Sequence, residues 1–159
     1  MKIPTVLSLC CALALTAACI DPISSPPCVE TLLTQTSVSG DTITLNTGLR
    51  YIEGATGSGA PSRWCLAIVT HHTEYLLDGT RLYSTHDDDR PIVFTPGLGD
   101  LIDGYEQGVV GMRSGSTRRL IVPPELAYGS QPQLNSSGQV VIPANSTLIY
   151  DIEVFNVAQ

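Results

Sequence analysis

The chain has 159 residues, 43% of them hydrophobic, with 8 basic and 15 acidic side chains and a formal charge of −7. The hydrophobic fraction excludes an intrinsically disordered chain, and the length suits one domain with an appendage. The acidic balance excludes a nucleic-acid binder, because such proteins neutralise phosphates with lysine and arginine.

The N-terminus has the pattern of an export signal. Lys2, the only lysine, precedes an uncharged apolar run over residues 6–18 that ends in small residues. A basic start, a short apolar stretch and small residues at its end are typical of a secretory signal peptide. The run is shorter than the roughly 20 apolar residues of a transmembrane helix. We therefore expect residues 1–18 to be a signal peptide.

The end of this signal resembles a bacterial lipobox, in which a cysteine is lipidated and becomes the new N-terminus. The residues are Leu15-Thr16-Ala17-Ala18-Cys19, with threonine where leucine is usual. This resemblance implies a lipid on Cys19 and a membrane-anchored lipoprotein facing the periplasm, since a multiply acylated terminus anchors stably. The alternative is ordinary cleavage after Ala18, which would leave a soluble periplasmic or secreted protein.

Loss of the signal changes the charge and the cysteine count. Removal of Lys2 takes the formal charge from −7 to −8, and two of the five cysteines leave with the signal. With Cys19 assigned to lipid, Cys28 and Cys65 remain. An exported compartment permits a disulfide between them. The sequence leaves two alternatives open: a disulfide, or two separate thiols with Cys65 buried in a strand.

The first part of the mature chain is predicted to be an appendage followed by strands. Residues 19–47 are expected to form a tether and N-terminal extension, the tether being residues 20–27 with Asp-Pro, Ser-Ser and Pro-Pro pairs. Short strands are predicted over 42–45 and 49–52. Residues 64–73 are rich in β-forming types. Asp78-Gly79 lies between two apolar runs and predicts a tight hairpin.

The second part contains the one segment with helical periodicity. Over residues 100–112, apolar side chains recur at spacings of three and four. Strands are predicted over 120–122 and 148–154, the latter with strict apolar and polar alternation. Several antiparallel strands with one short helix indicate an α+β fold, in which a curved sheet covers a helix.

The order of motifs resembles the FKBP-type peptidyl-prolyl isomerases, over about residues 48–157. The matching stretches include Leu77-Asp78-Gly79-Thr80, Pro91-Ile92-Val93-Phe94, Leu101-Ile102-Asp103-Gly104-Tyr105-Glu106-Gln107-Gly108, Ile121-Val122-Pro123-Pro124-Glu125-Leu126-Ala127-Tyr128-Gly129, Val141-Ile142-Pro143 and Asn145-Ser146-Thr147-Leu148. Each motif alone is weak, but their order and spacing are specific. We assign residues 48–159 to the isomerase domain.

The resemblance implies a fold, a reaction and partners. The fold is a twisted antiparallel sheet wrapped around one short helix, with an apolar pocket between them. The reaction is rotation about peptide bonds that precede proline, assisting protein folding outside the cytoplasm, and it requires no cofactor and no metal. Substrates would be proline-containing polypeptides, and macrolides would be inhibitors. Residues 20–47 lack the long helical arms by which some relatives dimerise, so we expect a monomer.

The resemblance also assigns individual residues. Ile102 matches a residue whose backbone N–H holds a substrate carbonyl, Tyr105 a pocket-floor tryptophan, and Tyr128 a tyrosine whose hydroxyl donates to the ligand. These three are the predicted catalytic residues. The predicted substrate-binding residues around them are His72, Leu82, Tyr83, Phe94, Leu101, Ala127, Ile142 and Tyr150.

Several positions depart from the family pattern. Phe-Asp-Ser of the family is Leu82-Tyr83-Ser84 here, and His-Tyr-Thr-Gly is His71-His72-Thr73-Glu74. These changes replace a pocket phenylalanine, an aspartate and a tyrosine. We therefore expect reduced isomerase activity and weakened macrolide affinity. The alternative function is a non-catalytic module that binds a peptide or protein.

The acidic stretch His86-Asp87-Asp88-Asp89 carries residue types that can bind a metal ion. Three consecutive acids cannot all face one ion without a dedicated loop, and the glycine spacing of a calcium loop is missing. We therefore interpret the stretch as a solvated loop and predict no metal site.

Overall fold

The computed structural model describes residues 27–158. Its strands are β1 (Gln35–Ser39), β2 (Thr42–Leu45), β3 (Arg50–Glu53), β4 (Ile68–Leu76), β5 (Arg81–Ser84), β6 (Ile92–Phe94), β7 (Thr117–Val122), β8 (Gln133–Leu134), β9 (Val140–Ile142) and β10 (Leu148–Val157). The helices are α1 (Asp103–Val109) and the 3-10 turn η1 (Pro124–Leu126). The predicted α+β fold is confirmed.

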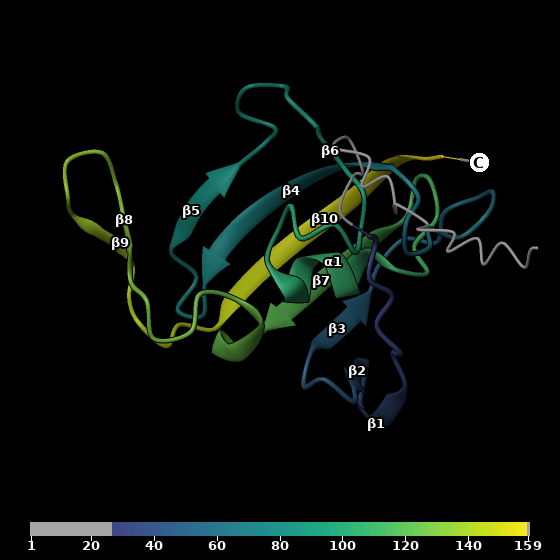
Figure 1. The fold of residues 1–159 in the computed structure, drawn as a ribbon, viewed down its shortest axis with the longest axis horizontal. Coiled ribbons are helices and arrows are strands. Elements are labelled where there is room, and N and C mark those ends of the chain that lie inside the picture. Colours follow the sequence, from purple (N-terminus) through teal and green to yellow (C-terminus); the bar gives the residue numbers. More distant parts are fainter. Residues whose placement is uncertain (1–26, 159) are drawn as a thin grey trace, which may run out of the picture.

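An antiparallel sheet forms the body of the molecule. Its strand order is β1-β2-β3-β7-β10-β4-β5. Strand β6 pairs with the first three residues of β4, Ile68 to Thr70. The long strand β10 lies between β4 and β7 (Figure 1). Its residues alternate between buried and more exposed positions, as the sequence pattern predicts for a strand with one face against the core.

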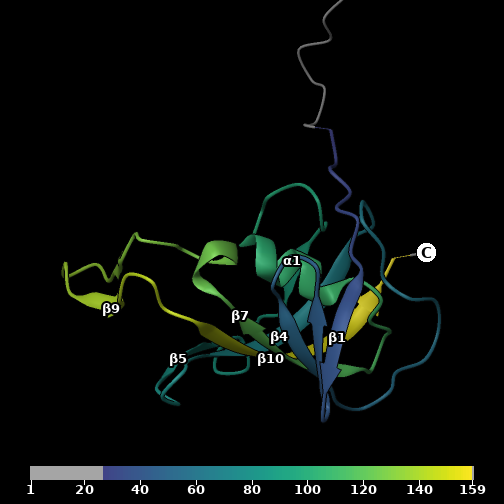
Figure 2. The same ribbon diagram turned by 90° about the horizontal axis from the view of Figure 1, so that it is seen from below.

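Helix α1 packs against one face of this sheet (Figure 2). Tyr105 and Val109 of the helix are buried there, together with Leu120 of β7 and Ile152 of β10. Arg118 holds the C-terminal end of the helix. Its guanidinium donates to the carbonyl oxygens of Gly108 and Val110 at 2.6 and 3.2 Å, which are the carbonyls that a helix end leaves without partners.

Local signals place the hairpin between β4 and β5. Gly79 adopts a φ of 90°, a conformation that glycine takes without steric cost. The Asp78 carboxylate accepts the N–H of Thr80 at 2.9 Å. The predicted tight turn is therefore present between Leu76 and Arg81.

Two predicted boundaries differ from the structure. The helix spans Asp103–Val109 and not residues 100–112, because Ile102 and Val110 both have extended backbone (ψ 144° and 133°). Strand β4 begins at Ile68, not at residue 64. The residues before it form turns, and Cys65 adopts a φ of 66°, which a strand does not accommodate.

The segment before residue 48 contributes to the sheet. Strands β1 and β2 pair with each other, and β2 pairs with β3, so residues 35–45 extend the sheet at one edge. Leu45 is part of the hydrophobic core.

A disulfide joins Cys28 to Cys65, with 5.7 Å between their Cα atoms. Of the two alternatives left open by the sequence, the structure contains the disulfide. Cys65 is exposed in a turn and is not buried in a strand.

Strands β8 and β9 form a hairpin that was not predicted from the sequence. The hairpin extends away from the body of the sheet (Figure 1), and Leu134 and Val140 on it are exposed. Strand β6 was also not predicted as a strand, since it is only three residues long and follows Pro91. Within residues 27–158, no helix has the length and apolar character needed to cross a membrane.

The disulfide is expected to stabilise the folded protein. Replacement of both Cys28 and Cys65 by serine should lower the free energy of unfolding by about 2–4 kcal/mol, because the crosslink restricts the unfolded chain over a separation of 37 residues. Urea denaturation of the oxidised protein and the double variant measures the difference. Wild-type protein in reductant is the control and should behave as the variant does. Equal urea midpoints for all three samples would contradict a stabilising crosslink.

Candidate functional site

A pocket of about 400 Å³ opens between the N-terminal end of α1 and the sheet. Residues from six parts of the fold line it: His72, Glu74, Ile92, Asp100, Leu101, Ile102, Tyr105, Tyr128 and Tyr150. The three predicted catalytic residues Ile102, Tyr105 and Tyr128 are thus brought together. His72, Leu101 and Tyr150, predicted as substrate-binding residues, lie with them.

Tyr105 forms the base of the pocket. Its side chain is 2% exposed, and its ring lies edge-on to the rings of Phe94, Tyr150 and His72 at centroid distances of 5.2–5.6 Å. Its hydroxyl lies 2.9 Å from Thr70 Oγ1 and 3.2 Å from His72 Nδ1. Burial raises the pKa of Tyr105, so the phenol is neutral. The hydroxyl is satisfied inside the protein, and the ring supplies an apolar surface.

Tyr150 and Glu74 form a second polar pair in the pocket. They are directly opposite each other on β10 and β4, which places both side chains on the same face of the sheet. The Tyr150 hydroxyl donates to Glu74 Oε1 at 2.8 Å. Burial, followed by the adjacent Glu74 charge, raises the pKa of Tyr150. Burial also raises the pKa of Glu74, and the hydrogen bond from Tyr150 partly opposes this effect.

The backbone of Ile102 is positioned by a buried carboxylate. Glu106 of α1 is 4% exposed. Its two oxygens accept the N–H groups of Gly97 at 2.8 Å and of Leu101 at 3.1 Å. These bonds fix the loop that leads into Ile102, whose own N–H has no hydrogen-bond acceptor among residues 27–158. That N–H is available to a substrate carbonyl.

Tyr128 follows the turn η1 and is half-buried at the pocket. Burial, followed by the charge of Glu74, raises its pKa. Its hydroxyl forms no hydrogen bond with another described residue. It is therefore a neutral donor available to a bound ligand.

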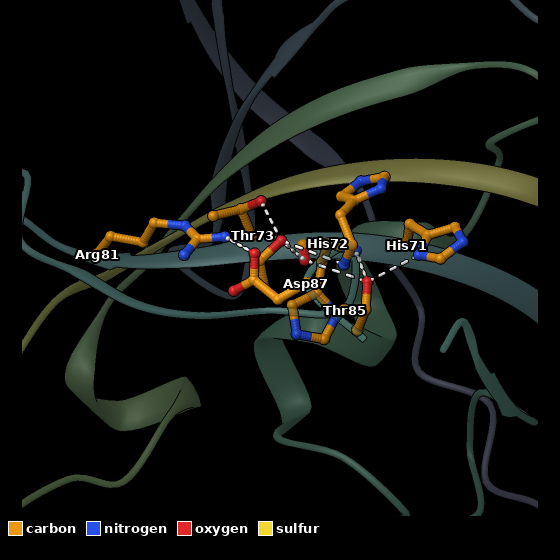
Figure 3. A network of polar contacts seen from close by, with 8 residues as sticks. His71, His72, Thr73, Arg81, Thr85 and Asp87 are labelled. Carbon is orange, nitrogen blue, oxygen red and sulfur yellow. Dashed lines mark hydrogen bonds and ion pairs between the residues drawn. The ribbon is translucent and has the colours of Figure 1, made fainter. Parts of the chain in front are cut away.

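His72 is held by a network between β4 and the loop after β5 (Figure 3). The backbone N–H of His72 donates to Thr85 Oγ1 at 2.9 Å, and the backbone N–H of Thr85 donates to the carbonyl oxygen of His72 at 3.0 Å. Arg81 and Asp87 close the neighbouring loop with an ion pair at 2.7 Å. Burial lowers the pKa of His72 to about 4, with smaller effects from His71 and His86. His72 is therefore neutral at pH 7.

Five other predicted substrate-binding residues do not line this pocket. Phe94 and Ile142 are buried in the hydrophobic core, Phe94 edge-on to Tyr105. Leu82 and Ala127 pack at the edge of the core. Tyr83 is 44% exposed, and its ring lies edge-on to His72 at 5.9 Å. These side chains support pocket residues or lie beside them.

Three pocket residues were not among the predicted site residues: Glu74, Ile92 and Asp100. The signal for Glu74 is its spacing from His72: residues two apart on a strand share a face. Asp100 directly precedes the motif that contains Ile102 and is exposed. Within the described part of the chain, no group of three or more His, Cys, Asp or Glu side chains is arranged to hold a metal ion.

The fold and the pocket define an α+β domain with a concave site lined mainly by apolar and aromatic side chains, and comparison with known proteins identifies its family. Residues 66–155 match the model of the FKBP-type peptidyl-prolyl cis-trans isomerases. The match covers more than half of the chain, which therefore belongs to this family. The resemblance inferred from the motifs is confirmed to that extent.

Two individual relatives show the extent of the similarity. The chain is 37% identical over 111 residues to the chloroplast protein "Photosynthetic NDH subunit of lumenal location 4" of Arabidopsis thaliana, covering 66% of this chain and 51% of the relative. It is 38% identical over 90 residues to the "FK506-binding protein" of Neisseria meningitidis serogroup C, covering 57% of this chain and 78% of the relative. The chain thus spans only about half of the first relative.

Solved structures show the same fold. The crystal structure of AtFKBP13 superposes with a TM-score of 0.67 at 30% identity, covering 74% of this chain and 98% of that one. FkpA from Escherichia coli gives a TM-score of 0.63 at 30% identity, covering 76% of this chain and 53% of that one.

The neutral, buried His72 generates a prediction about acid stability. The unfolded chain binds a proton at this residue near pH 6.5, whereas the folded protein does so only near pH 4. His72 should therefore cost stability as the pH falls from about 6.5 to about 4, on the order of 3 kcal/mol at most. His72→Phe should remove this loss. Denaturant titrations of both proteins from pH 7.5 to 4.5 measure the free energy of unfolding. The difference between the two curves of this free energy against pH removes the contributions of the other titrating groups. Parallel curves would contradict the assignment.

Proposed function

We propose that this protein catalyses the cis–trans isomerisation of peptide bonds that precede proline. The observation that carries the proposal is the pocket in which Ile102, Tyr105 and Tyr128 come together. Membership of the isomerase family supports it. The pocket is concave and lined mainly by apolar and aromatic side chains, as small binding sites are.

The chemistry follows from the nature of the bond. Amide resonance opposes rotation by about 18–20 kcal/mol, and X–Pro bonds exchange only in tens to hundreds of seconds. The twisted amide has lost its resonance and much of its charge separation. A site that excludes water favours this state relative to the planar amide, and each 1.36 kcal/mol gained is about a tenfold acceleration. In this proposal, the Ile102 N–H and the Tyr128 hydroxyl hold the substrate over the Tyr105 ring.

The altered residues around the pocket support a reduced rate. His72 places a polar ring next to Tyr105, and Tyr83 stands where the family pattern has an aspartate. Neither Tyr83 nor Leu82 is part of the pocket lining, so the aromatic surface and the carboxylate that the family has at these positions are not supplied. We infer that turnover and macrolide affinity are both lower than in relatives that keep those residues.

The cellular setting is also part of the proposal. The signal over residues 1–18 and the lipid on Cys19 lie outside the described residues. The disulfide between Cys28 and Cys65 is consistent with export, since such crosslinks persist in oxidising compartments. We propose a monomeric, lipid-anchored protein that acts on proline-containing polypeptides as they fold outside the cytoplasm.

A second candidate function is a non-catalytic peptide-binding module. The specific observation in its favour is the loss of the family's Phe-Asp pair at Leu82 and Tyr83. The pocket and its free donors would then bind proline-containing segments without accelerating rotation.

Removal of the Tyr128 hydroxyl tests the proposal that the protein is an isomerase. Tyr128→Phe should lower kcat/KM for a proline peptide about tenfold, because one substrate hydrogen bond is lost. The melting temperature should not change, since this hydroxyl bonds to no other described residue. Tyr75→Phe, on the same strand as Glu74 but outside the pocket lining, is the matched control. A protease-coupled isomerisation assay measures the rates, and a wild-type rate equal to the uncatalysed one would overturn the isomerase proposal.

The double substitution Leu82→Phe and Tyr83→Asp separates the two candidates. If the native protein is a slow isomerase, restoring this pair should raise kcat/KM by a modest factor, on the order of 3 to 10, as expected for one improved contact. Measurement in the same assay decides the matter. A variant that turns over rapidly while the native protein shows no activity would instead identify the native chain as a binding module.

A further inference from the structure

Glu74 introduces a carboxylate into the pocket at a position where the family motif has a glycine. The motif His-Tyr-Thr-Gly is His71-His72-Thr73-Glu74 in this chain. Strand β4 directs Glu74 to the same face as Tyr150, its direct partner on β10, and Tyr83, its direct partner on β5. The carboxylate is therefore part of the surface that a peptide in the pocket meets.

This carboxylate has a donor but no cationic partner. Oε1 accepts the hydroxyl of Tyr150 at 2.8 Å, whereas Oε2 accepts no hydrogen bond from the described residues. The ion pairs within residues 27–158 join Arg81 to Asp87, Arg118 to Glu53 and Arg119 to Asp151. No lysine or arginine lines the pocket, and its one histidine is neutral at pH 7.

Tyr150 keeps the carboxylate in a defined position. The Tyr150 side chain is itself buried at 5% exposure, with its ring against Tyr105 at 5.2 Å. The hydrogen bond therefore ties Glu74 to a rigid part of the core. A group that is already ordered loses little conformational freedom when a ligand binds. Asp100, the other carboxylate of the pocket, is exposed and has no comparable anchor.

We propose that Glu74 makes this pocket selective for polypeptides with a lysine or arginine side chain next to the proline. The inference rests on the proposed function, since it concerns the substrates of the same pocket. A charge-assisted hydrogen bond to a partly desolvated carboxylate is stronger than a neutral one. The cationic group supplies the partner that Glu74 lacks, and the aliphatic stem of lysine or arginine packs on the tyrosine rings.

The test compares peptides that differ only in the charge of one side chain. Lysine, norleucine or glutamate is placed immediately before or immediately after the proline, and kcat/KM is measured for each peptide. For the better of the two positions, wild-type protein should favour lysine over norleucine about tenfold and disfavour glutamate. In Glu74→Gln the ratio of lysine to norleucine should fall to about one.

Two further variants exclude other sources of the preference. Glu125→Gln removes one negative charge from an exposed site on η1 and controls for the overall charge of the protein. It should keep the lysine preference. Asp100→Asn should keep most of it as well. Loss of the preference in Asp100→Asn with retention in Glu74→Gln would overturn the assignment to Glu74.

The outcome also distinguishes this inference from the proposed function. If norleucine peptides are turned over and lysine gives no advantage in wild-type protein, the selectivity is refuted while the isomerase proposal stands. If no peptide is turned over, the isomerase proposal fails. Binding of the same peptides, measured by the change in tyrosine or tryptophan fluorescence, then reports the lysine preference directly, and equal affinities would refute it.

Discussion

The close approach of helix α1 to strand β7 is the constraint on which the pocket depends. A Cβ atom at Gly108 would lie 2.3 Å from Leu120 Cδ1, and one at Gly104 would lie 2.3 Å from Val122 Cγ1. Both neighbours are fully buried and cannot move without repacking the core. Glycine at these two positions lets the short helix lie directly on the sheet. Tyr105, between them in sequence, then reaches Thr70 and His72 on β4.

Two charged side chains fix the two ends of this helix, a carboxylate that accepts backbone N–H groups and a guanidinium that donates to backbone carbonyls. Glu106 binds the backbone N–H groups of Gly97 and Leu101 at the beginning, and Arg118 binds the carbonyls of Gly108 and Val110 at the end. Arg118 is also paired with Glu53 at 2.6 Å and lies over the ring of Tyr51 at 4.2 Å. A seven-residue helix is unstable alone, so these contacts and the core packing maintain it. The backbone geometry of Ile102 follows from that stability.

Local patterns in the sequence predicted the fold and part of the site. The Asp78-Gly79 turn, the alternation along β10 and the helical spacing around Tyr105 are local properties, and each was located to within a few residues. Ile102, Tyr105 and Tyr128 were brought together by the order of the family motifs. The disulfide could not be decided in this way, because it depends on where the segment around Cys28 crosses the turn at Cys65.

Glu74 and Arg118 were not assigned from sequence because their roles depend on strand register. The register sets Tyr150 opposite Glu74 and Ile152 opposite Arg118, and a shift of one residue would turn both charged groups to the other face. Nothing in the run Thr117-Arg118-Arg119 indicates which arginine is buried. The structure puts Arg118 in the core at 7% exposure and leaves Arg119 paired with Asp151 on the outer face.

The same register explains how a pocket with three tyrosines, a histidine and a glutamate can still present an apolar surface. Polar atoms buried without partners would cost free energy, but the Tyr105 hydroxyl is satisfied by Thr70 and the Tyr150 hydroxyl by Glu74. The rings of Tyr105 and Tyr150 line the pocket while their hydroxyls bond within the protein. Glu74 differs from the others because a carboxylate has more acceptor sites than one hydroxyl can occupy. Its remaining oxygen thus provides an anchored charge beside the neutral tyrosines and histidine of the pocket, and the chemistry of the residue beside the proline determines whether that charge helps or hinders binding.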